Sequence, residues 1–203
     1  MQIIKDIEQG SDEWLRLRMG VATASNFDKI ITAKTAKESS TLPKYSLQLA
    51  TEMLLDKPEE GYKNNAMQRG NELEPLARQV YQEETLQAVD EITMFKSDCG
   101  NFGYSPDGLV GDDGLIEIKC PLATTHLSYI LDGSMPSDYI QQVQCGLWIS
   151  ERQWCDFVSY HPNFKEKKLF IVRVERDEEY ISKLAELGKK AIAIRDELIH
   201  KIK

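Results

Sequence analysis

The sequence lacks the features that mark membrane and secreted proteins. No run of about 18 apolar residues is present, so we expect no membrane-spanning helix. The first residues, MQIIKDIEQGSDEW, lack the apolar segment of a secretory signal peptide. Both absences indicate a cytoplasmic protein. With 203 residues, the chain has the length of a single domain (1–203) and can bury a substantial core without disulfides.

Clustered metal-binding cysteines and an excess of positive charge are also missing. The four cysteines, Cys99, Cys120, Cys145 and Cys155, form no C-x-x-C pair, and the three histidines are scattered. We therefore expect four unpaired, buried thiols rather than a zinc site. The formal net charge is −8, which argues against a general nucleic-acid-binding protein, because phosphate binding needs clustered Lys and Arg. Any DNA-directed function has to answer this objection.

What is present is an alternation of helical and strand patterns. A short helix is predicted at 11–18, with Ser11 as its cap and Gly20 at its end. Further helices are predicted from 24, at 45–55, 72–84 and 137–149, and from about 178, with a polar loop at 33–44. Extended segments are predicted at 91–95, 101–111, 114–122, 154–161 and 168–175. This order predicts an α/β or α+β fold with a central mixed β-sheet flanked by helices.

The segment GYSPDGLVGDDGLIEIKCPL (103–122) places charges in runs that otherwise look buried. Such charges are costly unless they are paired or bind a metal. Because side chains alternate along a strand, Glu117 and Lys119 share one face, and pairing across the turn can bring Asp107 close to Glu117. Adjacent carboxylates repel unless a cation neutralises them, and oxygen ligands of this kind suit Mg²⁺ or Mn²⁺. Carboxylates, metal and lysine together can hydrolyse a phosphodiester.

An exposed hairpin face with alternating Glu and Lys would give the same E-x-K pattern. The preceding Ser-Pro-Asp-Gly favours a site, because Pro106 and Gly108 fix an irregular backbone beside the acid. The spacing P-D-x₉-E-x-K matches the PD-(D/E)XK nuclease superfamily. The blocks WLRLRMGVATAS, RGNELEPLAR, GYSPDGL, LIEIKCP and YIQQVQCGLWIS follow in the order seen in the phage lambda exonuclease and YqaJ-like recombinase family. The chain resembles that family over roughly residues 8–180.

The resemblance implies a restriction-endonuclease-like core and a set of metal-binding residues. Asp107, Glu117 and the backbone carbonyl of Ile118 would bind metal, and Lys119 would position the attacking water. Glu74 would support a second metal, directly or through water. Two Mg²⁺ ions per site are expected, and Mn²⁺ can replace them.

The alternatives for the helical acid and the motif glutamine stay open. A solvated acid at a helix start would also explain Glu74, and Glu72 competes with it from another side of the helix. Gln142 matches a motif glutamine near the active site, and Gln141 and Gln144 are expected to point elsewhere.

The same resemblance implies residues that bind the DNA end. Arg18 matches the arginine that binds the terminal 5′-phosphate, and Ser25 and Ser105 match hydroxyls of that pocket. A guanidinium with hydroxyl donors suits a phosphate. Met67 falls where an apolar side chain splits the terminal base pairs, although a core methionine is as good an interpretation. Tyr139 and Trp148 are expected to be packing residues.

The function implied is a Mg²⁺-dependent 5′→3′ exonuclease that digests one strand of linear double-stranded DNA. It would leave a 3′ overhang for a single-strand annealing protein during phage-type recombination in a bacterial host. The resemblance also implies a homotrimeric ring. Such a ring would keep a protein of net charge −8 on DNA by encircling it, and Lys34, Lys37 and Lys44 are candidates for residues that line its channel. A restriction- or repair-type endonuclease and a catalytically silent DNA-binding protein are the alternatives.

Overall fold

The computed structural model describes residues 1–58 and 65–203, without the side chains of residues 65–67. Two β-sheets form its framework. The larger sheet has the order β3 (Val89–Asp90), β6 (Gly108–Val110), β7 (Gly114–Lys119), β8 (Trp154–Tyr160) and β9 (Leu169–Glu175). Neighbouring strands are antiparallel except for β7 and β8, which run parallel. The predicted mixed sheet flanked by helices is confirmed.

The smaller sheet was not predicted. Its order is β1 (Gln2–Ile4), β4 (Met94–Lys96), β5 (Phe102–Tyr104) and β2 (Ala22–Thr23), with β5 and β2 parallel. The segment 101–111 was predicted as one extended run, but the chain breaks at 105–107 and gives β5 and β6 to different sheets. Pro106 explains the break, because it has no N–H for a strand ladder.

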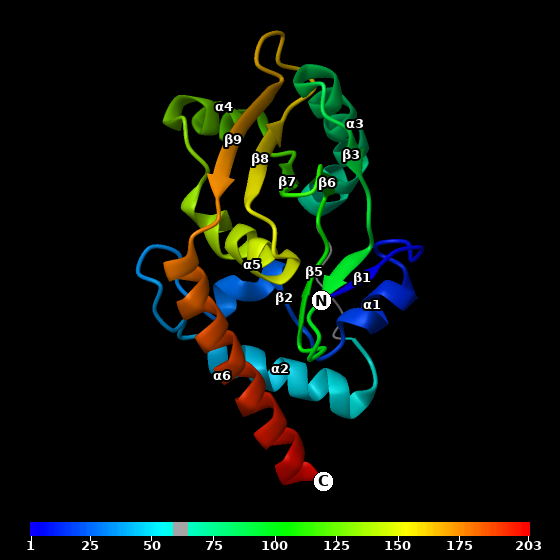
Figure 1. Ribbon diagram of the computed structural model, residues 1–203, viewed down its shortest axis with the longest axis vertical. Coiled ribbons are helices and arrows are strands. Elements are labelled where there is room, and N and C mark those ends of the chain that lie inside the picture. Colours follow the sequence, from blue (N-terminus) through cyan, green and yellow to red (C-terminus); the bar gives the residue numbers. More distant parts are fainter. Residues whose placement is uncertain (59–64) are drawn as a thin grey trace.

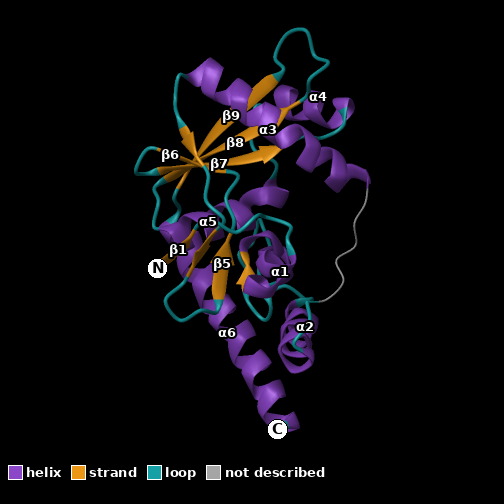
Figure 2. Cartoon of the chain, turned by 90° about the vertical axis from the view of Figure 1, so that its right-hand side faces the viewer, coloured by secondary structure: helices purple, strands orange, loops and turns teal. Residues whose placement is uncertain are grey.

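The helices cover the two sheets, as Figures 1 and 2 show. They are α1 (Asp12–Arg18), α2 (Leu42–Leu55), α3 (Asn65–Thr85), α4 (Ala123–Asp132), α5 (Ile140–Ser150) and α6 (Glu178–Ile202), with 3₁₀ turns η1 (Ala24–Lys29) and η2 (Ser137–Tyr139). In both views, α5 lies where the two sheets meet, and it contacts β4 and β5 of the smaller sheet and β8 of the larger one. This placement lets a side chain of α5 reach the end of β7, where Gln142 bonds Glu117.

Several predicted boundaries are confirmed and others are wrong. Ser11 caps α1 by accepting from the N–H of Trp14, and Gly20 follows the helix end with φ +66°. The helix predicted from residue 24 is only the 3₁₀ turn η1, and α2 begins inside the predicted loop 33–44. Helix α4 was missed, because LATTHLSYI has no strong cap and its apolar residues stay exposed or half-buried.

Two apolar clusters hold the framework together. One lies between the smaller sheet and helices α2, α5 and α6, with Phe27, Phe95 and Leu147 at its centre. The other joins α3 to one face of the larger sheet, where Ala77 and Tyr81 pack with Ile116 and Ile118. Since Ile116 and Ile118 face α3, Glu117 and Lys119 face the opposite side of β7, as strand alternation requires.

Two further expectations can be compared with the structure. The four cysteines all lie in the described part of the chain and are free thiols. The prediction that all are buried is wrong, because Cys99 is exposed in a turn and Cys120 is half-buried. Within the described residues, no helix is long and apolar enough to cross a membrane.

Candidate active site

The hairpin charges meet at the end of β7. Asp107 directly precedes β6, and its Oδ2 accepts a hydrogen bond from the N–H of Ile118 at 2.6 Å. Glu117 is 1% exposed, and its Oε1 accepts from Lys119 Nζ and from Gln142 Nε2, both at 2.5 Å. Lys119 of β7 and Gln142 of α5 therefore converge on one buried carboxylate, and Asp107 is tied to the next residue of the strand.

Glu117 is also held from within the protein. The hydroxyl of Tyr104 lies 3.3 Å from Glu117 Oε2 and donates to it. Burial, together with the charge of Glu117, raises the pKa of Tyr104, so the hydroxyl keeps its proton. The Tyr104 ring packs against Gly146 of α5, where an added Cβ would lie 2.7 Å from a ring carbon. Tyr104 is a contact that the sequence did not indicate.

In this cluster two buried carboxylates share one lysine as their counter-charge. Burial raises the pKa of Asp107 well above its usual value, and the charge of Glu117 adds to the rise. Burial tends to lower the pKa of Lys119, but the charges of Glu117 and Asp107 outweigh it and raise that pKa. One lysine therefore does not neutralise the two acids, and a cation bound beside them would be stabilised.

Glu74 approaches the same cluster from α3. Burial raises its pKa, Arg78 acts against that rise, and the charge of Glu117 adds to it. Arg78 Nη2 donates to Glu74 Oε1 at 2.6 Å, Nε donates to the carbonyl of Asp107 at 2.8 Å, and Nη1 pairs with Glu91 at 2.7 Å. Arg78, which sequence reasoning missed, thus ties the helical acid to the turn that carries Asp107.

The competing acid lies elsewhere. Glu72 is exposed and accepts from Gln68 at 2.9 Å, one helical turn back. Of the two acids, only Glu74 has an interaction with Glu117 and Lys119.

The donor set fits a divalent cation that keeps most of its water. Among the described residues, no group of three His, Cys, Asp or Glu side chains is arranged to hold a metal by itself. Asp107 and Glu117 supply hard carboxylate oxygens, and Asp107 is tied to the N–H of Ile118, the residue that follows Glu117. Mg²⁺ is commonly bound by one or two carboxylates, with water and substrate phosphate completing its shell. The residues present therefore suit Mg²⁺ or Mn²⁺ better than a structural metal.

A second group of polar residues gathers around Arg18 at the end of α1. Arg18 Nη2 donates to Thr23 Oγ1 at 3.2 Å and to Ser25 Oγ at 3.3 Å. Its guanidinium lies 4.2 Å from the centre of the Trp14 ring, and Trp14 Nε1 donates to Ser105 Oγ at 3.1 Å. Burial lowers the pKa of Arg18, although Tyr45 and Glu52 act to raise it. The structure thus brings Ser105 to Arg18 and Ser25, which lie about 80 positions earlier in the sequence.

This cluster is continuous with the acidic one. Ser105 stands two residues before Asp107 in the break between β5 and β6. Thr23 and Trp14 belong to the cluster but were not identified from the sequence. Trp14 contacts Ser105, 91 positions away, whereas Thr23 bonds Arg18, only five positions away. Two hydrogen bonds fix Gly20 in the turn after Arg18. The N–H of Gly20 donates to Glu52 at 3.0 Å, and the carbonyl of Gly20 accepts from Arg195 of α6 at 2.5 Å.

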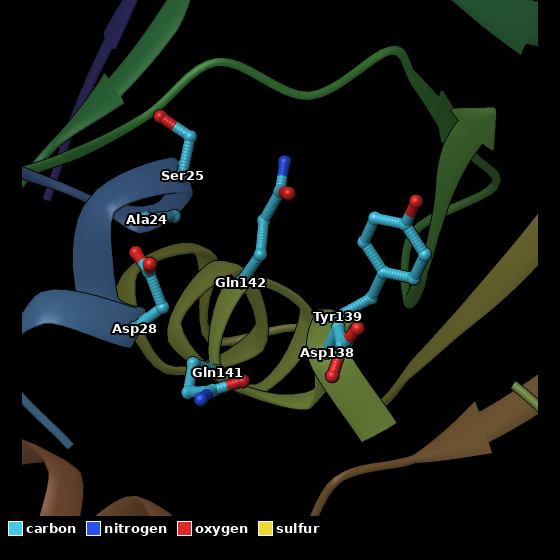
Figure 3. A pocket seen from close by; sticks show the side chains of 7 residues that line it. All are labelled: Ala24, Ser25, Asp28, Asp138, Tyr139, Gln141 and Gln142. Atoms are coloured by element: carbon cyan, nitrogen blue, oxygen red, sulfur yellow. The ribbon is translucent and has the colours of Figure 1, made fainter. Parts of the chain in front are cut away.

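Helix α5 separates its glutamines as the sequence indicated. Gln142 points to Glu117, while Gln141 donates to the carbonyl of Ile31 and Gln144 to that of Glu175. Figure 3 shows Gln142 between Ser25 and Tyr139.

Of the remaining predicted residues, Trp148 packs against Phe27 and Phe102. Tyr139 packs on Phe157 and also faces the site, because the centre of its ring lies 5.2 Å from Lys119 Nζ. Met67 lies in the first turn of α3, and its side chain falls outside the described residues.

Comparison with known sequences decides the family. A sequence model of the YqaJ-like viral recombinase domain matches residues 13–153. The chain belongs to the YqaJ-like viral recombinase family. The predicted resemblance is thereby confirmed. Part of the YqaJ-like chain also matches the uncharacterized protein ExoD of Escherichia coli K12, with 30% identity over 69 residues, 34% of this chain and 79% of ExoD.

Solved structures agree with this assignment. The YqaJ-like chain is similar to the alkaline exonuclease LHK-Exo of Laribacter hongkongensis, with 36% identity, a TM-score of 0.86 and coverage of 95% of this chain and 96% of that one. LHK-Exo in complex with dAMP gives 38% identity, the same TM-score and the same coverage. A phage-related exonuclease from Haemophilus somnus 129PT shares the fold, with a TM-score of 0.72, 18% identity and coverage of 90% and 96%.

Proposed function

We propose that the chain is a divalent-cation-dependent 5′→3′ exonuclease that digests one strand of linear double-stranded DNA and leaves 3′ overhangs. The observation that carries the proposal is the continuity of the two clusters. Arg18 bonds Ser25 and packs on Trp14, Trp14 bonds Ser105, and Ser105 is two residues from Asp107. A guanidinium with hydroxyl groups suits a terminal phosphate, and the acidic cluster suits phosphodiester hydrolysis. Similarity to LHK-Exo, an alkaline exonuclease, supports exonuclease activity.

The chain's own residues have separate tasks in this proposal. Asp107, Glu117 and the carbonyl of Ile118 would hold the cation, with Glu74 supporting a second one. When bound, the cation would polarise the scissile phosphate and lower the pKa of water. Lys119 is anchored on Glu117 but keeps a quarter of its side chain exposed, so its ammonium can donate to the incoming water or to the phosphate.

Other residues orient these groups. Gln142 and Tyr104 hold the two oxygens of Glu117 in fixed directions. Arg78 fixes Glu74 relative to the Asp107 backbone. Arg18 would bind the 5′-phosphate and thereby place the first phosphodiester bond at the acidic cluster. Because the bound end aligns only the first phosphodiester bond with the acidic cluster, one bond would be cut at a time.

One experiment separates this proposal from its alternatives. Linear duplexes with 5′-phosphate or 5′-hydroxyl ends and a covalently closed circle are incubated with the protein in Mg²⁺ or in EDTA. We expect digestion of linear DNA only, faster from phosphorylated ends, with 3′ single strands as products and no reaction in EDTA. Cleavage of the circle would instead identify an endonuclease. Absence of cleavage with retained DNA binding would identify a silent binding protein.

We also propose that three chains close into a ring around DNA and pass the 3′ overhang to a single-strand annealing protein in the bacterial cytoplasm. A chain of net charge −8 is repelled by DNA. To stay on one DNA strand through many cleavage cycles, the protein therefore has to encircle it. Lys34, Lys37 and Lys44 are exposed and follow Ile31, whose carbonyl bonds Gln141 next to the acidic cluster. Because they are exposed, these lysines are candidates for the positively charged lining of the channel.

A further inference from the structure

A pocket of about 420 Å³ adjoins both clusters, between η1 and the start of α5 (Figure 3). Its size is within the range of small-molecule sites. It is lined by Ala24, Ser25, Asp28, Asp138, Tyr139, Gln141 and Gln142.

The pocket lies between the two groups that would hold the ends of one nucleotide. Ser25, on one side, bonds Arg18, the proposed ligand of the 5′-phosphate. Gln142, on the other side, bonds Glu117, part of the proposed cleavage site. A terminal nucleotide has its 5′-phosphate at the first group and the bond to be cut at the second. Its sugar and base must therefore occupy the space that Ser25 and Gln142 border.

The lining of the pocket is rich in hydrogen-bond acceptors. Asp28 and Asp138 contribute exposed carboxylates. Gln141 is 5% exposed, and its Oε1 is the one buried side-chain nitrogen or oxygen without a partner in the described part of the chain. Because Gln141 Nε2 donates to the carbonyl of Ile31 at 3.2 Å, the amide oxygen is turned to the other side. Figure 3 shows this oxygen directed toward Asp138 and Tyr139.

A buried acceptor without a partner is unfavourable, and a ligand that brings an N–H donor removes the penalty. Cytosine and adenine present an exocyclic amino group, whereas thymine and uracil present a carbonyl oxygen at the corresponding position. Tyr139, whose ring packs on Phe157, also lines the pocket.

We propose that this pocket binds the base of the 5′-terminal nucleotide and favours cytosine and adenine, whose exocyclic amino group would donate to Gln141 and Asp138. The inference rests on the proposed nuclease function for the placement of the nucleotide. It extends that function from recognition of a phosphorylated end to discrimination of the base at that end.

The matched probes are dCMP and dUMP, which differ at position 4 of the base, where dCMP carries an amino group and dUMP a carbonyl. Binding of each to the whole protein is measured by isothermal titration calorimetry with nucleotide at millimolar concentration. One net hydrogen bond corresponds to about a threefold to tenfold difference, so dCMP should bind tighter than dUMP by that factor. Equal affinities, or no binding of either nucleotide, would overturn the proposal.

Variants assign the preference to the pocket. Gln141→Leu should bring the dCMP/dUMP ratio close to one. Since loss of the bond to Ile31 can weaken folding, Asp138→Ala, at an exposed position, is a second variant, and it should also reduce the ratio. Asp132→Ala, an exposed acid of α4 outside the pocket, should leave the ratio unchanged. A ratio that persists in both pocket variants would place the discrimination elsewhere.

A nuclease assay on the same preparation separates the two levels of inference. If linear duplexes are digested but dCMP and dUMP bind equally, the exonuclease proposal stands and base discrimination fails. If dCMP is preferred but no duplex is digested, the pocket stands as a nucleotide site and the exonuclease proposal fails.

Discussion

Replacement of Arg18 by alanine tests end recognition most directly. The guanidinium is preorganised, since it packs 4.2 Å from the centre of the Trp14 ring and two hydroxyl groups orient its Nη2. Little conformational entropy is then lost when it binds a phosphate. A hydrogen bond to a charged group contributes about 1.5–3 kcal/mol, which corresponds to roughly a tenfold to 150-fold change in rate. We expect kcat/KM on 5′-phosphorylated duplexes to fall by this factor.

The assay compares kcat/KM of Arg18→Ala on 5′-phosphorylated and 5′-hydroxyl duplexes in Mg²⁺. Activity on 5′-hydroxyl ends should change little, so the advantage of phosphorylated ends should narrow. Arg16→Ala is the matched control, because Arg16 is exposed in the same helix turn and makes no contact with the cluster through its side chain in the described structure. Equal losses on both kinds of end would refute the reasoning and make Arg18 a structural residue or a general DNA contact.

Three further predictions concern the metal, the packing and the assembly. Mn²⁺ at ten times its Kd should add about 1.4 kcal/mol of stability and raise Tm by roughly 3–6 °C in scanning fluorimetry. Asp107→Asn should abolish this rise in Tm, whereas Lys119→Ala should keep the rise in Tm but lose DNA cleavage. The rise in Tm should also be smaller at lower pH, because a raised pKa of Asp107 lets protons compete with the cation. Gly146→Ala should lower the free energy of unfolding in urea by about 1–3 kcal/mol, since its Cβ would lie 2.7 Å from the Tyr104 ring, and an unchanged midpoint would contradict this. Light scattering should show a trimer of about three times 23.2 kDa whose digestion resists competitor DNA, and a stable monomer arrested at once by competitor would contradict the ring.

Local patterns in the sequence were sufficient for features that depend on near neighbours. Strand alternation in LIEIK predicted that Glu117 and Lys119 share a face, and the structure places Ile116 and Ile118 on the other. The Ser11 cap and Gly20 predicted the limits of α1. The periodic apolar residues after Glu178 predicted α6. In each case the deciding interactions lie within a few residues along the chain.

Boundaries failed where tertiary contacts outweighed local preference. The run 101–111 reads as one strand, but Tyr104 and Gly108 belong to different sheets, because the partners of each strand come from distant segments. Helix α4 has weak local signals, yet His126 is fully buried between Ser159 and the carbonyl of Lys167. Such elements are stabilised by the surfaces they pack on rather than by their own sequence.

The sequence by itself determined the kind of chemistry, since the residue types and the spacing P-D-x₉-E-x-K already specified two carboxylates and a lysine on one hairpin. Only the tertiary structure decided which other residues join them. Trp14 reaches Ser105 across 91 positions, Arg78 reaches the carbonyl of Asp107 across 29, and Gln142 reaches Glu117 across 25. The physical reason is that a hydrogen bond needs its donor and acceptor within about 3 Å, and only packing of α1, α3 and α5 against the two sheets brings these groups that close.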